Sequence, residues 1–377
     1  MATRKARRAE LVLVYEGADI SRDIAPYLVT FSYTDNASDK ADDLSVTLED
    51  RKGNWRDPWF PSKGAVIHAT IITHDWHGPN ETESLPCGTF EIDEVECSGP
   101  PTQVQIKAVS TLVSKGMRQE QKTKAWENAK LSVVADDVAK KNGLTLFWDS
   151  PNDPLFERRD QVEMSDLGFL QKLCREYGIG IKVTDTQLVC YDEETYEAKA
   201  AIAAISFGDK HIKNYRFRTK TRGTYKGARL QYHHPVKNEN LEVYTAGDAE
   251  GTGEDLVINQ KADTLDDAEK IAQKKLHDAN KKETTGSITL VGDMRFLGGS
   301  NVTVSGWGKF DGGYFIEKAT HNVNKGSGYV TSIELRLGGP SKKGKGKKGK
   351  TKYGPLDSGF DVYGKETGNQ PAGGNSF

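Results

Sequence analysis

Apolar and polar residues alternate along most of the first part of the chain. Runs that place Val, Ile, Phe or Thr at every second position lie at 30–35, 44–50, 65–75 and 103–110. This period of two is typical of strands with one buried face. Gly and Pro separate the runs, as expected of turns. Residues 1–110 are therefore predicted to form an all-β unit, a sandwich or a barrel.

The period changes in residues 111–205. Apolar positions at helical spacing predict one helix over 129–141 and another over 165–178. The runs IGIKVTD and QLVCYDE that follow predict a hairpin over roughly 179–193. This region is predicted to be a small α+β module inserted between β units.

The second of these helices carries clear end signals. Ser165 is a predicted N-cap, Asp166 suits the positive end of the helix dipole, and Gly178 is expected to end the helix. Its predicted apolar side consists of Leu167, Leu170, Cys174 and Tyr177, widened by Phe169 and Leu173.

Residues 206–340 return to strand patterns, interrupted by one predicted helix over 264–282. Thr264, with Asp267 three residues later, approximates a capping box. The run GYFIEKATHNV is predicted to pair with YVTSIELRL across a turn at NKGSG. Strict alternation would place Tyr314, Ile316, Lys318, Thr320 and Asn322 on one side of this strand, and Phe315, Glu317, Ala319, His321 and Val323 on the other.

Charge is divided unevenly along the 377 residues. Residues 341–377 hold eight lysines and three acidic residues, so they carry +5 of a formal net charge of −2, and residues 1–340 carry −7. An acidic body disfavours a nucleic-acid-binding role. The run SKKGKGKKGK has too few apolar residues to fold alone, and predicts a flexible or partner-ordered tail. Docking onto an acidic protein is the main alternative to a plain linker.

Candidate chemistry is sparse. Cys87, Cys97, Cys174 and Cys190 form no C-x-x-C and are predicted to be reduced structural thiols. His74 and His77 form an H-x-x-H on a predicted strand end rather than on a helix, and the adjacent His233 and His234 would face opposite sides of a strand, so neither pair favours a metal site. His321 lies on a strand without a marked nucleophile or carboxylate partner. The sequence therefore predicts no catalytic residue, no metal and no cofactor.

The chain is expected to be made as a soluble cytoplasmic protein. The apolar run LVLVY near the start is too short for a secretion signal, and no run approaches the roughly 18 apolar residues of a membrane span.

Three stretches, in this order, resemble the late control protein D family of phage tail hub proteins. They are residues 30–55 (TFSYTDNASDKADDLSVTLEDRKGNW), residues 164–183 (MSDLGFLQKLCREYGIGIKV) and residues 262–336, so the resemblance spans about 30–340. It implies a mainly β fold with two tail-tube-like β-barrel domains, 1–110 and 206–340, around the α+β insert, and the tail lies outside the resemblance.

The resemblance implies structural roles for the residues of these motifs. They are Asp43, Trp55, Ser165, Asp166, Phe169, Leu170, Tyr177, Gly178, Ala268, Gly306, Gly313, Tyr314, His321, Tyr329 and Thr331. In the tail, the candidate contacts to a spike or another partner are Lys342, Lys343, Lys345, Lys347, Lys348 and Tyr353.

The implied function is that of a baseplate hub in a contractile phage tail or a phage-tail-like bacteriocin, assembled in the bacterial cytoplasm. Three copies would form a ring of six similar barrels that adapts a sixfold tail tube to a threefold spike. The implied partners are the spike, the tail tube or its initiator, the tape-measure protein and baseplate wedge proteins, with no membrane and no nucleic acid. The alternatives are a hub or spike component of a contractile secretion system and, with less support, a tail-associated cell-wall hydrolase.

Overall fold

The computed structural model describes residues 6–110, 117, 118, 120–184, 186–220, 222–234, 239–247, 253–262 and 264–338. The predicted tail, with its candidate contacts from Lys342 to Tyr353, lies outside the described residues. The chain divides into two compact units. The first joins Met1–Thr224 to Asp278–Gly346, and the second joins Tyr225–His277 to Lys347–Phe377.

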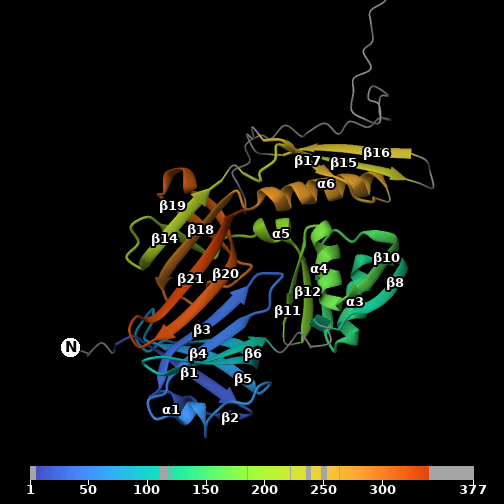
Figure 1. Cartoon of the computed structure of the whole chain (residues 1–377). Coiled ribbons are helices and arrows are strands. Elements are labelled where there is room, and N and C mark those ends of the chain that lie inside the picture. Colours follow the sequence, from blue (N-terminus) through green and yellow to red (C-terminus); the bar gives the residue numbers. More distant parts are fainter. Residues whose placement is uncertain are drawn as a thin grey trace, which may run out of the picture. The chain divides into compact units, whose positions relative to one another are not determined.

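Among the described residues, thirteen strands of the first unit form one large sheet (Figure 1). They are β1 (Arg8–Tyr15), β2 (Ala18–Asp19), β3 (Leu28–Asn36), β4 (Asp43–Glu49), β5 (Val66–His74), β6 (Thr82–Ser98), β7 (Gln103–Ser110), β13 (Ala203–Ser206), β14 (Ile212–Thr219), β18 (Thr284–Val291), β19 (Asn301–Ser305), β20 (Gly312–Asn324) and β21 (Gly328–Leu337). Their order is β14-β18-β21-β20-β3-β4-β7-β6-β5-β1-β2, while β19 pairs with β20 and β13 pairs with β19. Short helical turns α1 (Ser21–Ile24), η1 (Asn54–Arg56) and η2 (Gly308–Phe310) lie between strands.

The alternation seen in the sequence produces two apolar clusters on this sheet. One lies in the N-terminal β region and includes Phe31, Ile71 and Phe90. The other lies in the C-terminal β region and includes Ile288 and Ile333. The prediction of a mainly β chain is confirmed, because strands supply most of the ordered backbone.

The two β regions are parts of the same sheet. β3, near the start of the chain, pairs antiparallel with β20, near its end, from Lys318↔Asn36 to Asn324↔Thr30. The sequence pattern did not reveal this pairing, since each strand looks the same whichever neighbour it has. The two-barrel division at 110 and 205 remains a prediction.

The predicted strict alternation of β20 is wrong. A β-bulge between Ile316 and Lys318 interrupts the register with β21. One extra residue inverts the alternation beyond it, so Tyr314, Ile316 and Ala319 all pack in the C-terminal apolar cluster. The predicted pairing of β20 with β21 is confirmed.

The insert has the predicted α+β character. Its elements are β8 (Lys122–Lys130), α3 (Leu131–Lys141), β9 (Thr145–Asp149), β10 (Leu155–Met164), α4 (Asp166–Glu176), β11 (Ile179–Val183), β12 (Gln187–Asp192) and α5 (Glu193–Glu197). β8 pairs with β10, and β11, β12 and β9 form a separate three-stranded sheet. Both predicted helices and the predicted hairpin are therefore confirmed.

The second unit contains a small sheet of its own, in the order β16-β15-β17. These strands are β16 (Glu239–Ala246), β15 (Gly227–His234) and β17 (Asp255–Ile258). Helix α6 (Leu265–Asn280), of which all but the last three residues belong to this unit, confirms the helix predicted over 264–282. The Thr264 side chain accepts a hydrogen bond from the Asp267 backbone N–H at 3.1 Å, which is half of the predicted capping box. No helix in the described part of the chain is long and apolar enough to cross a membrane.

Candidate functional site

The structure gathers three of the predicted residues, His321, Tyr329 and Thr331, at the seam between β3, β20 and β21. His321 is fully buried, and its Nε2 lies 3.0 Å from the Phe296 carbonyl oxygen, which can only accept a hydrogen bond. Nε2 therefore carries the proton, and Nδ1 accepts one from the Tyr329 hydroxyl at 2.7 Å. The Thr331 hydroxyl lies 3.3 Å from the same Nδ1.

The surroundings of His321 keep the ring neutral. Burial lowers the pKa of His321 to about 4, although the hydrogen bond to the Phe296 carbonyl opposes this shift. The ring stacks on Tyr33 of β3, with centroids 6.0 Å apart. A neutral, hydrogen-bonded ring of this kind links the two β regions, and its arrangement is that of a core residue rather than a catalytic base.

A second polar joint fixes the insert to the sheet. It is formed by the end of β3 and the acidic loop that follows, where Asp35 of β3 and Asp42 of the loop both contact the Lys182 ammonium of β11. The second Asp35 oxygen accepts the Gly298 backbone N–H at 2.8 Å. Burial opposes the charge on Lys182, but the two carboxylates outweigh it and raise the pKa of that lysine. Burial also raises the pKa of Asp42 to about 6.

The same loop holds the insert through its backbone. The Gln171 amide donates to the Asp39 carbonyl at 2.9 Å, and the Tyr191 hydroxyl donates to the Ala37 carbonyl at 3.1 Å. The Asp39 backbone N–H donates to the Ile181 carbonyl at 3.1 Å. The Asp-rich turn can be recognised in the sequence. Its partner Lys182 cannot, because Lys182 lies 147 positions after Asp35.

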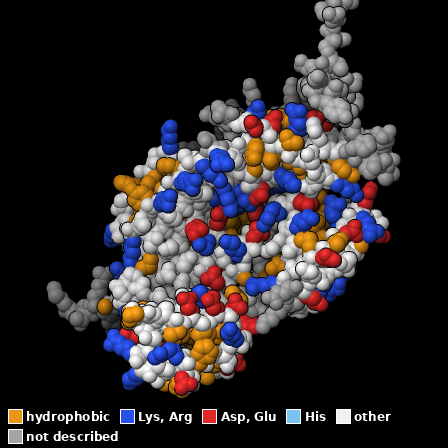
Figure 2. Space-filling view, in the orientation of Figure 1, with side chains coloured by type: hydrophobic (Ala, Val, Ile, Leu, Met, Phe, Trp, Pro, Cys, Tyr) orange, Lys and Arg blue, Asp and Glu red, His pale blue; other side chains and the backbone are white. Residues whose placement is uncertain are grey.

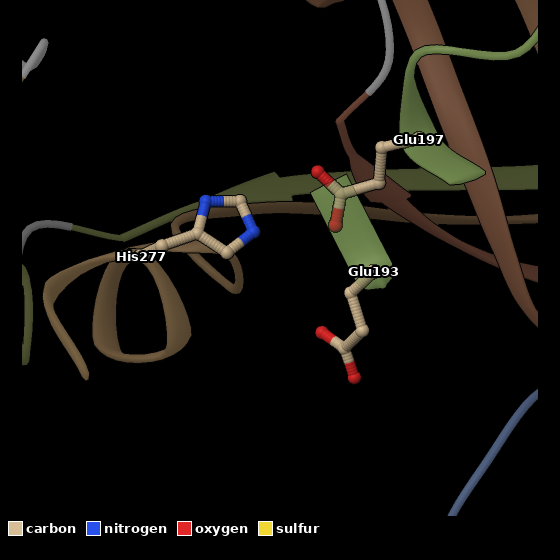
Figure 3. Close-up of side chains that lie close together, drawn as sticks. All are labelled: Glu193, Glu197 and His277. Atoms are coloured by element: carbon tan, nitrogen blue, oxygen red, sulfur yellow. The ribbon is translucent and has the colours of Figure 1, made fainter. Parts of the chain in front are cut away.

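A third joint lies around Arg336, which is almost completely buried on β21. Its guanidinium pairs with Glu197, with Glu193 at 3.6 Å and with Glu317 at 3.3 Å. Lys281 adds a second cation, 2.9 Å from Glu193. The side chains of Glu193 and Glu197 extend from α5 (Figure 3), so this cluster ties the end of the insert to the C-terminal β region.

Among the described residues, neither compact unit contains by itself a group of three His, Cys, Asp or Glu side chains close enough to hold one metal ion. His277, which Figure 3 also labels, is part of the second unit. His74 pairs with Glu10 at 3.1 Å, and His77 with Glu83 at 3.5 Å, so the two histidines of the H-x-x-H motif have separate partners. The side chains of His233 and His234 are outside the described residues.

The remaining predicted residues support local structure. The Ser165 hydroxyl accepts the Gly168 backbone N–H at 3.2 Å and so caps α4, as predicted. Burial opposes the charge of Asp166, but hydrogen bonds from Lys122 and Gln161 outweigh it and lower its pKa. Phe169, Leu170 and Tyr177 are core residues of the insert, Ala268 is buried on α6, and Gly178 adopts a φ of 65° directly after Tyr177, the C-cap of α4.

The predicted residues of the β regions also support local structure. Asp43 begins β4, and burial raises its pKa. Gly306 has a φ of 88°, and a Cβ there would lie 2.9 Å from the Cβ of Phe207. Gly313 pairs with Thr303 of β19, and the Tyr314 hydroxyl donates to the Phe310 carbonyl at 2.8 Å.

Trp55 lines an apolar surface pocket of about 670 Å³. Tyr27, Trp59 and Phe60 also line this pocket, and the rings of Trp55 and Trp59 contact edge to face at 5.3 Å. The Trp55 indole N–H is buried, and no described residue accepts a hydrogen bond from it. The pocket lies in the N-terminal β region, and the sequence does not reveal it because its lining residues come from many separate segments between Leu13 and Ile106.

Solved structures share this fold. A tail protein from Neisseria meningitidis MC58 superposes with a TM-score of 0.66 at 11% identity, over 87% of this chain and 96% of its own. The 43 kDa tail protein of prophage MuSo2 from Shewanella oneidensis superposes with a TM-score of 0.66 at 15% identity, over 87% of this chain and 98% of its own. An Escherichia coli component of the type VI secretion system superposes with a TM-score of 0.51 at 11% identity, over 83% of this chain and 73% of its own. The chain thus has the fold of phage tail proteins.

The sequence comparison is more specific. A family described as phage tail baseplate hub (GPD) matches residues 92–327, which is more than half of the chain. The probable baseplate hub protein of Escherichia phage 186 is 24% identical, over 86% of this chain and 92% of its own. That of Escherichia phage P2 is also 24% identical, over 87% and 93%. This chain belongs to the phage tail baseplate hub family, and its role is that of a hub.

Proposed function

We propose that this chain is the central hub of a contractile-tail baseplate, in a phage or a phage-tail-like bacteriocin, and that three copies form its ring. The family match over residues 92–327 carries this proposal. The ring would adapt a sixfold tail tube to a threefold spike, with six similar β barrels provided by three chains.

The buried joints support a role in transmitting force. A hub that travels with tube and spike must keep its parts in register, and this chain connects its β regions by paired backbone and its insert by buried ion pairs. The alternative of a secretion-system hub is supported by the fold alone, because the type VI component shares only 11% identity.

The proposed partners are the spike, the tube or its initiator, the tape-measure protein and baseplate wedge proteins. Lys342, Lys343, Lys345, Lys347, Lys348 and Tyr353 remain the proposed contacts of the tail with a spike or a neighbouring hub. Deletion of residues 341–377 is expected to weaken spike binding, and full binding by the deleted chain would contradict this assignment.

We further propose that the chain acts without catalysis. The polar residues at its centre are engaged in buried hydrogen bonds and ion pairs. A zymogram on peptidoglycan tests this, and a cleared band at the position of this chain would contradict it.

The mass in solution tests the ring. Light scattering after size exclusion should give three times 41.6 kDa, either for the protein alone or with its spike. A monomer in both conditions would remove the ring from the proposal.

A further inference from the structure

The strand β14 forms one end of the large sheet. It pairs with β18 from Ile212↔Leu290 to Thr219↔Thr284, and the strand order ends there. No strand in the described part of the chain pairs with its other side. The backbone N–H and C=O groups along that side therefore form a free edge, which another extended segment can extend by strand addition.

Positive charge is concentrated along this edge. The segment 210–222 contains no acidic residue and has the cations Lys210, Lys213, Arg216, Arg218, Lys220 and Arg222. Of these, Arg216 and Arg218 are exposed on the strand, and neither forms an ion pair with the described residues. By contrast, Lys107 in the middle of the sheet pairs with both Glu94 and Glu96. The β14 edge is thus an uncompensated basic strip.

Exposed aromatic residues lie beside this basic strip. Phe207 is 59% exposed and Tyr215 is 45% exposed. Both rings contact the Trp307 ring, at 5.6 Å and 5.4 Å, and the buried Trp307 indole N–H has no hydrogen-bond partner among the described residues. Basic and hydrophobic side chains also gather at this end of the sheet in the surface view (Figure 2).

Cations alone on an edge strand have a simpler explanation, because lysine and arginine protect free edges against aggregation. The aromatic patch does not fit that explanation. A protected edge gains nothing from two large exposed rings, whereas a binding surface does. A free edge, unpaired cations and exposed rings together therefore indicate that β14 is a binding site for another polypeptide segment.

We propose that the β14 edge binds an extended acidic segment of another polypeptide, which adds to the sheet as its next strand. Carboxylates at every second position of such a segment would repeat about every 6.6 Å, as Arg216 and Arg218 do on one face of β14. A polypeptide fits better than a nucleic acid, because its backbone offers the N–H donors and C=O acceptors that a free edge requires. This inference goes beyond the hub role and does not depend on the ring.

The test uses the full chain and a fluorescein-labelled ten-residue peptide of alternating Glu and Thr, followed by fluorescence anisotropy at low salt. Binding should weaken at least tenfold in Arg216→Glu/Arg218→Glu. The matched control is Lys52→Glu/Lys63→Glu, which makes the same charge change at two exposed lysines that form no ion pair with the described residues, and it should bind within twofold of the wild type. Tyr215→Ala should weaken binding severalfold, while Phe147→Ala, at an equally exposed ring of the insert, should not.

Two further peptides separate strand addition from simple charge attraction. A peptide of alternating Gln and Thr lacks the carboxylates and should bind at least tenfold more weakly. A peptide of alternating Glu and Pro keeps the charge but loses half of its N–H donors, so it should also bind at least tenfold more weakly.

The inference is overturned if the Glu-Thr peptide does not bind, or if the Lys52→Glu/Lys63→Glu control loses the same affinity. It is also overturned if the Glu-Pro peptide or a twenty-nucleotide oligo-dT binds as tightly, since the strip would then be a general polyanion surface. Thermal melting of each variant confirms that it is folded, and Tyr215→Ala provides the test without a charge change should the double variant unfold.

Discussion

The seam between the two β regions and the joint between the sheet and the insert differ in how they are held. At the seam, β3 and β20 share a ladder of backbone hydrogen bonds, and the buried side chains of His321 and Tyr329 are neutral. At the insert no strand of the large sheet pairs with an insert strand among the described residues, and Lys182 between two carboxylates makes the connection. The β3–β20 seam is thus held by paired backbone with neutral side chains, whereas the insert joint depends on buried charge.

The largest expected effect follows from Lys182→Met. The change leaves Asp35 buried without its cation, and breaking a buried pair in this way costs about 3 to 5 kcal/mol. Urea unfolding measures the loss. Lys40→Met, at an exposed lysine of the same loop, should change stability by less than about 0.5 kcal/mol. A loss below about 1 kcal/mol for Lys182→Met would show that the ionic joint is not essential.

The seam should respond to acid. The folded pKa of His321, about 4, lies below an unfolded value near 6.5, so folding favours the neutral ring. Its contribution is fully present above pH 6.5 and is lost as the pH falls towards 4. Between pH 7 and pH 4.5 we expect a loss of about 2 kcal/mol that His321→Gln does not show. Parallel pH profiles of the two proteins would contradict a neutral, buried ring.

The stability contributed by the insert joint should change with pH in the opposite direction. The folded pKa of Asp42, about 6, lies above its unfolded value near 3.9, so the joint takes up a proton on folding. Stability should therefore rise by about 1 kcal/mol between pH 7 and pH 5, and Asp42→Asn should lack this rise. The comparison is made by denaturant unfolding of both proteins at each pH, and an identical slope would show that Asp42 is not shifted.

The smallest effect is expected from Tyr329→Phe at the seam. The change removes the hydroxyl that donates to His321, but the Thr331 hydroxyl lies 3.3 Å from the same nitrogen and can replace it. The expected loss is about 1 kcal/mol. Tyr215→Phe, at a half-exposed ring, serves as the control. A loss well above 2 kcal/mol would show that the hydroxyl has no substitute.

Local features of this chain could be predicted, and long-range ones could not. The cap at Ser165, the helix at 165–178 and the β20–β21 hairpin all follow from residues close in sequence. The bulge at Ile316 was missed because the flanking residues alternate as a regular strand would. The β3–β20 pairing and the choice of Lys182 by Asp35 depend on which distant segments meet, and neither charge nor period specifies that.

The same limit applied to the basic β14 edge. The cations of 210–222 are evident in the sequence, but their pattern is that of any half-exposed strand. Only the strand order shows that β14 has a free side, and only the fold places Phe207 and Trp307 beside Tyr215.

The pairing of β3 with β20 also has a consequence for the order of events during synthesis. Asn36 and its partner Lys318 are separated by 282 positions. At about 5 to 20 residues per second, roughly 15 to 60 s pass between their appearance on the ribosome. Throughout that interval β3 has a neighbour on only one side, β4. The most non-local strand pairing of the sheet can therefore close only after β20 has been made, and the nascent chain must keep that edge of β3 unpaired until its C-terminal partner arrives.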